Sequence, residues 1–212
     1  MKKLIALLLA AVLVMSLVAC GNTDTTPETT TEAPVETTEA IEGTTEDTVA
    51  APAIEANAAT EILTTIWNAV AEDSRFFAMG GDMENMVDNA PGNYGLTDVE
   101  ALTATLYVPA DQVANIACAS SLMHGMMANN FTAGLYQLAE GTTTADFAAT
   151  MKTAIGSVQW LCGMPETLLI AEIEGEFVLV VFGINDAINP FRTALETAYP
   201  GAEIITDEAI AG

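Results

Sequence analysis

Residues 167–182 have the sequence TLLIAEIEGEFVLVVF, and this stretch decides the fold. Two runs rich in apolar and β-branched residues, Thr167–Ile173 and Glu176–Phe182, flank the dipeptide Glu174-Gly175. Runs of this length and composition favour strands, and a short turn containing glycine favours an antiparallel hairpin between them. The sequence therefore predicts a β-hairpin that belongs to an antiparallel sheet.

A strand and a helix are predicted before this hairpin. Residues 131–139 alternate two sets of side chains, as a strand with both faces largely covered does, and Gly141 ends the strand. Thr143 and Asp146 have the spacing of a capping box, which favours a helix start. The expected apolar stripe of this helix comprises Phe147, Met151, Ile155, Val158 and Cys162. We expect the helix to end at Gly163 and Pro165, because glycine and proline follow helix ends.

A second helix and a last strand are predicted after the hairpin. Asn189 is the expected N-cap, with Pro190 at the first helical position. The inward side chains would be those of Phe191, Leu195 and Ala198, and Pro200-Gly201 would end the helix before a strand at Glu203–Thr206. The order from Phe131 is then β-α-β-β-α-β, which is typical of ferredoxin-like α+β folds. The sequence thus predicts an antiparallel sheet with helices on one face.

Shorter helices are predicted ahead of this part. Apolar residues recur at helical spacing from Ala58, with Thr60 as the expected N-cap. A loop rich in Gly and Asn follows at 80–95, and Thr97-x-x-Glu100 opens a short helix that ends near Val108-Pro109. Residues 112–127 are ambiguous, because their alanines favour a helix whereas the alternation at 115–123 favours a strand. We favour the strand.

The first 19 residues have the pattern of an export signal. Lys2 and Lys3 precede an apolar run from Leu4 to Val18 that is interrupted by Ser16. At roughly 1.5 Å per residue this run is shorter than the about 30 Å core of a bilayer. Such a segment is typical of a signal peptide that is cleaved.

The residues that end this signal, Leu17-Val18-Ala19-Cys20, resemble the lipobox of bacterial lipoproteins. The resemblance implies that Cys20 receives a diacylglycerol and becomes the first residue of the mature protein, with or without a further N-acyl chain such as palmitate. It also implies that the protein is held at the outer, extracytoplasmic face of the bacterial cell membrane. No other cofactor is expected.

Three parts of the chain follow from these patterns. Residues 1–19 are the signal peptide, and residues 20–57 are the lipidated cysteine with a tether rich in Thr, Glu and Pro. The tether has too few apolar residues to offset its backbone entropy, so we expect it to be disordered. Residues 58–212 form a single α+β ectodomain.

The charge of the chain limits its partners. The formal charge is −24, and loss of Lys2 and Lys3 with the signal would leave −26. Nucleic acids and anionic lipid headgroups need clustered Lys and Arg, so we expect no nucleic-acid partner. The membrane contact would be made by the acyl chains, and an envelope protein is the expected partner.

The globular part resembles a group of uncharacterised lipoproteins of Gram-positive-type bacteria, some labelled bacteriocin-transport accessory proteins. The resemblance lies in the order of elements and in Trp160-Leu161-Cys162-Gly163-Met164-Pro165. The label implies a thioredoxin-like redox role. That chemistry needs two thiols two residues apart at a helix N-terminus, whereas Cys162 is a single thiol that we expect near a helix C-terminus. A packed thiol is the alternative, and Cys118 and Cys162 either pair or stay separate.

Methionines and the single histidine suggest a second chemistry. Met123, His124, Met126 and Met127 lie together, and thioether and imidazole ligands select Cu(I). A further cluster is formed by Met79, Met83 and Met86. The alternative is that these side chains fill irregular parts of the core.

Other candidate chemistries have weaker patterns. Asp82, Glu84 and Asp88 lack the spacing of an EF-hand, so a solvated acidic loop is the simpler interpretation. Ser120 and Ser121 lie near His124 without a nucleophile elbow. We therefore expect no enzyme, but a non-catalytic binding or adaptor domain; the alternative is a soft-metal (Cu or Ag) or thiol-redox protein. The candidate binding residues are Gly80, Gly81, Asp82, His124, Asn129 and Asn130.

Overall fold

The predicted hairpin lies inside a large antiparallel sheet, next to its last strand. In a computed structural model that describes residues 55–126, 130–161 and 163–210, strand β6 (Thr167–Ile173) pairs with β7 (Phe177–Gly183). Glu174 and Gly175 in the turn both have positive φ, 55° and 78°. Both strands are almost completely buried, which explains their continuous apolar sequence.

The sheet has the order β2-β1-β4-β5-β7-β6-β8, and β3 also pairs with β4. Every neighbouring pair is antiparallel. The remaining strands are β1 (Ala78–Gly80), β2 (Val87–Asp88), β3 (Gly92–Tyr94), β4 (Ile116–His124), β5 (Phe131–Leu138) and β8 (Glu203–Ala209). The α+β class and the antiparallel sheet are therefore as predicted. The strand favoured for 115–123 is β4, whereas the loop expected at 80–95 contains β2 and β3 and the end of β1.

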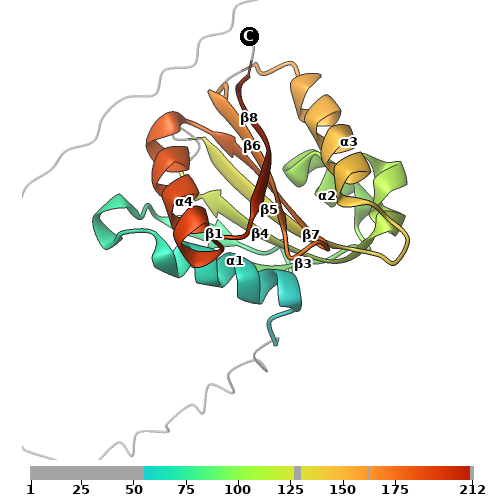
Figure 1. The fold of residues 1–212 in the computed structure, drawn as a ribbon, viewed down its shortest axis with the longest axis horizontal. Coiled ribbons are helices and arrows are strands. Elements are labelled where there is room, and N and C mark those ends of the chain that lie inside the picture. Colours follow the sequence, from blue (N-terminus) through green and yellow to red (C-terminus); the bar gives the residue numbers. More distant parts are fainter. Residues whose placement is uncertain (1–54, 127–129, 162, 211–212) are drawn as a thin grey trace, which may run out of the picture. The chain divides into compact units, whose positions relative to one another are not determined.

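Helices cover both faces of the sheet, so the prediction that they lie on one face is wrong (Figure 1). Helices α1 (Ala58–Ala69) and α4 (Asn185–Ala198) pack on one apolar cluster with alternate residues of β5, β6 and β7. Helices α2 (Val99–Leu106) and α3 (Thr144–Gly156) pack on the other, with the intervening strand residues. Two 3₁₀ turns, Glu72–Ser74 and Ala110–Asn115, complete the elements.

Strand topology explains why α3 and α4 lie on opposite faces. The element order from β5 is β-α-β-β-α-β as expected, but the spatial order is β5-β7-β6-β8. Both helical crossovers therefore move in the same lateral direction, from β5 to β6 and from β7 to β8. The two crossovers start from β5 and β7, which run in opposite directions. If both connections are right-handed, as such connections almost always are, their helices must lie on opposite faces of the sheet. The placement of β8 beside β6 decides this, and local sequence does not encode it.

Three of the four predicted helix starts differ from the structure, by one to five residues, and the start of α3 is as predicted. Asn57, and not Thr60, caps α1 by accepting a hydrogen bond from the Thr60 N–H at 2.9 Å. Asp98, next to the predicted Thr97, caps α2. Thr143 caps α3 as predicted, with its hydroxyl accepting from the Asp146 N–H.

Helix α3 ends earlier than predicted. The predicted end is Gly163, whereas the helix ends at Gly156, where the Ser157 N–H and hydroxyl both bond to the Ala154 carbonyl. Val158 and Trp160 therefore belong to the connection that leads to β6. This connection is what builds the pocket described below.

Helix α4 begins earlier than predicted. The expected N-cap was Asn189, whereas the helix begins at Asn185 and contains Pro190 in its interior. The early start is stabilised because the Asn185 N–H donates to the Glu166 carboxylate at 2.7 Å. It also buries Ile188 completely against the sheet.

Candidate pocket beside the end of the sheet

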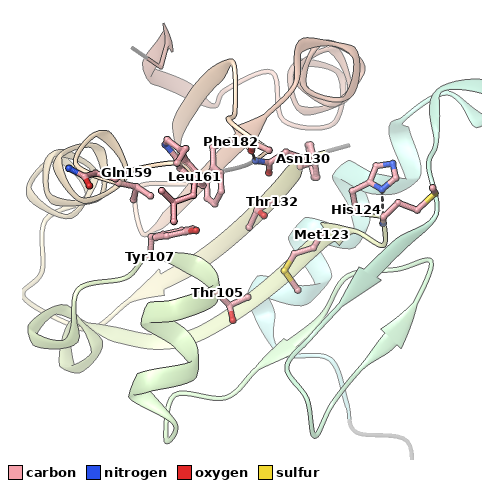
Figure 2. Close-up of a pocket in the computed structure, with 14 residues that line it drawn as sticks. Thr105, Tyr107, Met123, His124, Asn130, Thr132, Gln159, Leu161 and Phe182 are labelled. Carbon is pink, nitrogen blue, oxygen red and sulfur yellow. Dashed lines mark hydrogen bonds between the residues drawn. The ribbon is translucent and has the colours of Figure 1, made fainter. Parts of the chain in front are cut away.

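An open pocket of about 410 Å³ lies at the end of the sheet where β4 and β7 finish and β5 begins (Figure 2). Its walls come from three further segments: the C-terminal end of α2, the connection after α3, and the turn after β4. Asn130 joins two of these segments, because its side-chain N–H donates to the Gly163 carbonyl. The pocket thus brings together residues that are far apart in the sequence.

Three aromatic rings form one wall of this pocket. Tyr107 lies edge-on to Phe182 at 5.5 Å between centroids and to Trp160 at 5.3 Å. Trp160 and Phe182 are themselves 5.7 Å apart. Such aromatic contacts are favourable beyond the area that they bury. The wall is therefore a fixed apolar surface.

Tyr107 adopts a strained backbone conformation to join this wall. Its φ is 57° and its ψ is 23°, in the left-handed region that bulky residues rarely adopt. Conformations of this kind cost on the order of 1–3 kcal/mol and concentrate at functional sites. Here the strain turns the chain at the end of α2 and places the Tyr107 ring against Trp160.

The connection after α3 contains a buried hydrogen-bond donor without a partner among the described residues, and an exposed apolar side chain on the pocket rim. The Nε1 of Trp160 is buried and has no hydrogen-bond partner among the described residues. The next residue, Leu161, is 94% exposed although its side chain is large and apolar. A buried unpaired donor costs about 1–3 kcal/mol, so its persistence beside a pocket needs an explanation.

The residues that line the described part of this pocket carry no charged side chain, in a chain with 29 carboxylates. The polar groups are hydroxyls, amides and the His124 imidazole. Burial lowers the pKa of His124 below its usual value and favours the neutral ring. The arrangement suits an uncharged ligand.

The His124 ring is fixed from two sides. Its Nδ1 accepts a hydrogen bond from the Met126 N–H at 3.0 Å, so the ring proton of the neutral form is on Nε2. Phe76 stacks on the ring with the centroids 4.5 Å apart. Figure 2 shows the His124 ring on one side of β4 and the Met123 thioether directed to the other, toward Thr105.

The residues predicted to form a binding site fall into two groups. His124 and Asn130 line the pocket, whereas Gly80, Gly81 and Asp82 line a neighbouring cavity of about 110 Å³. Thr105 and Met123 line both the pocket and the neighbouring cavity. Asn129 and Met127 lie outside the described residues, as does Cys20.

Methionines from the two sequence clusters meet in this neighbouring cavity. Met79, Met83 and Met86 line it together with Met123. Met126 is on the rim of the larger pocket and is 57% exposed. The cavity therefore combines Met123 with the more distant cluster and not with its sequence neighbour His124.

Asp82 organises the loop beside this cavity. One carboxylate oxygen accepts N–H groups of Glu84 and Asn85 at 2.9 and 2.8 Å, and the other accepts the Gly95 N–H at 2.6 Å. Burial acts to raise the pKa of Asp82, but these hydrogen bonds outweigh it and the pKa is lowered. Asp82 is thus an ionised cap of its own loop.

The thiols and serines considered for catalysis have structural partners. Cys118 is a free thiol within the described part of the chain, and it donates to the Gln137 side chain at 3.3 Å. The side chain of Cys162 lies outside that part. Ser120 and Ser121 are buried and donate to the carbonyls of Gly92 and Gly81. Within residues 55–126, 130–161 and 163–210, no three His, Cys, Asp or Glu side chains are grouped as a metal site.

Sequence reasoning missed the aromatic wall of the pocket. Trp160 and Leu161 were noticed for their resemblance to a redox motif, while Tyr107 and Phe182 were assigned to a helix end and a strand. The sequence offered no signal for this wall, because Trp160 and Leu161 fell inside a helix predicted to end at Gly163, whereas the helix ends at Gly156.

Comparison of the chain with protein-family models, with curated proteins and with solved structures gives no match. Among the described residues no helix has the length and hydropathy needed to span a membrane.

Proposed function

We propose that this chain is a lipid-anchored binding protein of the extracytoplasmic face of a bacterial membrane. Its ectodomain would hold an uncharged, largely apolar ligand in the pocket beside Tyr107 and Trp160. The observation that carries the proposal is the chemistry of the lining, which is aromatic and uncharged in a chain of formal charge −24. Concave apolar sites with a few placed polar groups are typical of small-molecule binding.

The pocket suggests the kind of ligand. The rings of Tyr107, Trp160 and Phe182 offer apolar contact to a flat group. The Nε1 of Trp160 is buried without a partner among the described residues, so a ligand acceptor that reached it through a turn of the ring would remove the cost of an unpaired donor. A flat apolar group that carries one acceptor combines both properties.

The geometry around the single histidine favours binding over catalysis. A general base needs a free nitrogen directed at its target, but Nδ1 of His124 already accepts the Met126 N–H. Ser120 and Ser121 donate to backbone carbonyls across the sheet. These residues of β4 bind backbone groups of neighbouring segments and form no nucleophile-base pair.

The location part of the proposal is supported by sequence. The pattern Leu17-Val18-Ala19-Cys20 follows a short apolar run, and residues 20–57 would act as a spacer between lipid and domain. Two acyl chains bind a membrane far more firmly than one, because each buried methylene contributes about 0.8 kcal/mol. Such an anchor would hold an acidic domain near a surface that repels it.

Binding of an uncharged fluorescent probe, N-phenyl-1-naphthylamine, tests the proposed site. The full chain is compared with Tyr107→Ala and Leu161→Ser variants, and with an Ile205→Ser control that changes an exposed apolar residue of β8. We expect Tyr107→Ala to weaken binding about 10-fold or more, because buried aromatic anchors dominate binding energy. Leu161→Ser should weaken binding less, and Ile205→Ser should leave it unchanged.

One outcome of this binding experiment would contradict the proposed site, provided that background binding and folding are controlled. All variants share residues 1–57, so probe held by the apolar run there is a common background. Circular dichroism and thermal unfolding show whether each variant is folded. Equal affinity in folded wild-type and Tyr107→Ala chains would contradict the proposed site.

A further inference from the structure

We infer that Met79, Met83, Met86 and Met123 form a thioether site for a soft monovalent ion, Cu(I) or Ag(I). This site adjoins the aromatic pocket, with Met123 lining both, and goes beyond the ligand proposed for that pocket. The four side chains come from β1, the loop after it and β4, and they line one cavity of about 110 Å³.

Strand register brings the first two thioethers together. Met79 of β1 is paired directly with Met123 of β4. Side chains at directly opposed positions lie on the same face of a sheet, with their Cβ atoms about 4.5–5.5 Å apart. That face is the one covered by α2, because the neighbouring Leu122 packs in the cluster beneath α1 and α4. The flexible side chains can then bring both sulfurs to one ion.

The loop after β1 places the other two thioethers, those of Met83 and Met86, at the same cavity. Asp82 accepts the N–H groups of Glu84, Asn85 and Gly95, which holds the turn that carries Met83 and Met86. Gly80 packs so closely on residues 90–92 that a Cβ there would lie 2.3 Å from the Ala90 oxygen. The loop is therefore held in place over the cavity.

Exposure argues against a purely structural role for these methionines. A methionine that fills a gap in a core is buried, whereas Met83 is 85% exposed and Met86 is 47% exposed. Exposed thioethers beside a small cavity leave their lone pairs accessible to an ion from solvent. The formal charge of −24 would raise the local concentration of any cation.

The ligand types select the ion. Neutral thioethers are soft ligands and favour Cu(I), whereas Ca²⁺ and Mg²⁺ need several oxygens. Asp82 is the carboxylate of this cavity, and both of its oxygens already accept backbone N–H groups. Nδ1 of His124 is likewise occupied by the Met126 N–H. The set of ligands is therefore thioether alone.

Metal titration of the full chain tests this site. The starting protein carries Cys20→Ser, Cys118→Ser and Cys162→Ser, so that no thiol competes for the ion. Cu(I) is delivered under reducing conditions from a competing chelator, and Ag(I) is titrated separately. We expect one ion per chain. Mutation of residues that only orient the metal ligands already weakens metal binding roughly 10–100-fold. Removal of two direct ligands in the Met79→Leu/Met123→Leu variant should therefore weaken binding more than about 100-fold.

Matched substitutions locate the site. Met126→Leu with His124→Phe removes the two soft groups beside the cavity and should leave the affinity unchanged, as should Met164→Leu, which changes an exposed methionine elsewhere. Loss of binding in the Met126→Leu/His124→Phe protein, with retention in the Met79→Leu/Met123→Leu protein, would overturn the assignment. Absence of stoichiometric binding to the starting protein would overturn it as well.

A measurement on the starting protein, with all its methionines present, covers the case in which the Met79→Leu/Met123→Leu variant does not fold. The methionine methyl groups are labelled with ¹³C in the starting protein and followed by NMR during Ag(I) addition. Single Met→Leu variants assign the signals. We expect the methyl signals of Met79, Met83, Met86 and Met123 to shift with one equivalent of Ag(I). Shifts confined to other methionines, or no shift, would refute the site.

Discussion

His124 is the only histidine of the chain, and its surroundings determine how stability depends on pH near neutrality. Burial lowers the pKa of His124 in the folded protein below the value of 6.5 for an unperturbed group. The unfolded chain then binds the proton more readily than the folded one, so protonation favours unfolding. The stabilisation is complete above pH 6.5 and is lost as the pH falls through the lowered pKa.

We therefore expect the free energy of unfolding to decrease when the pH is lowered from 7.5 to 5.5. His124→Phe keeps a ring to stack on Phe76 and removes the titrating group, so it should flatten the profile in this range. Urea unfolding at several pH values measures both slopes. The range from pH 7.5 to 5.5 lies above the region below pH 4 in which Asp82 is protonated. Protonation of Asp82 is a second destabilising event, because the pKa of Asp82 is also lowered in the folded protein. Parallel profiles for the two proteins would refute this role.

Gly80 and Gly156 provide a matched pair for backbone packing. A Cβ on Gly80 would lie 2.3 Å from the Ala90 oxygen and 2.4 Å from the Gly92 nitrogen, both of them backbone atoms. Gly80→Ala should therefore destabilise the protein by about 1–3 kcal/mol, as overpacking does. A Cβ added at Gly156 of α3 would meet no atom of other parts of the structure within 4 Å. Gly156→Ala should therefore stabilise the protein by about 0.4–1 kcal/mol. Denaturant midpoints test both, and equal effects would show that β1 is not packed on residues 90–92.

Elements are predicted well where local chemistry alone decides them. The hairpin at 167–182 and the Thr143 cap of α3 are as predicted, because turn geometry and side-chain capping involve residues near one another in sequence. The start of α4 is five residues earlier than predicted because the carboxylate of Glu166, distant in sequence, accepts the Asn185 N–H. The predicted end of α3 is wrong by seven residues, since the apolar pattern of the sequence continues past Gly156 to Val158, which lies outside the helix.

Proline 190 tests where α4 begins. At the first position of a helix proline is favourable, whereas in the interior it costs about 3 kcal/mol relative to alanine. Pro190 lies within Asn185–Ala198. Pro190→Ala should therefore stabilise the protein, by about 1–3 kcal/mol after allowance for the adapted helix. Thermal unfolding measures the change, and a destabilised variant would support a helix that starts at Pro190.

The whole molecule depends on contacts that no sequence pattern encodes. The two-sided cover of the sheet follows from β8 pairing with β6, and the pocket follows from Tyr107, Trp160 and Phe182 meeting across three elements. His124 and Asn130 were sequence candidates because His and Asn are chemically distinctive, and both line the pocket. The aromatic wall was not found, because apolar residues in a helix end or a strand have the same pattern whether they line a pocket or a core.

Lipidation of Cys20 is the prediction at the scale of the protein in its cell. In a bacterial host fed an alkyne-tagged fatty acid, the wild-type chain should incorporate the tag. Cys118→Ser and Cys162→Ser chains should incorporate it equally, and Cys20→Ala should lose it completely. Tag retained in the Cys20→Ala chain would contradict the anchor.

The two tryptophans test the proposed pocket most directly. The Nε1 of Trp67 is held by the Asn89 carbonyl at 3.0 Å, whereas the Nε1 of Trp160 has no partner among the described residues. The full chain labelled with ¹⁵N-tryptophan gives two indole N–H signals, which Trp67→Phe assigns. During titration with N-phenyl-1-naphthylamine we predict a saturable shift of the Trp160 signal and a fixed Trp67 signal. A stationary Trp160 signal at saturating probe, or a shift of Trp67 alone, would contradict the account.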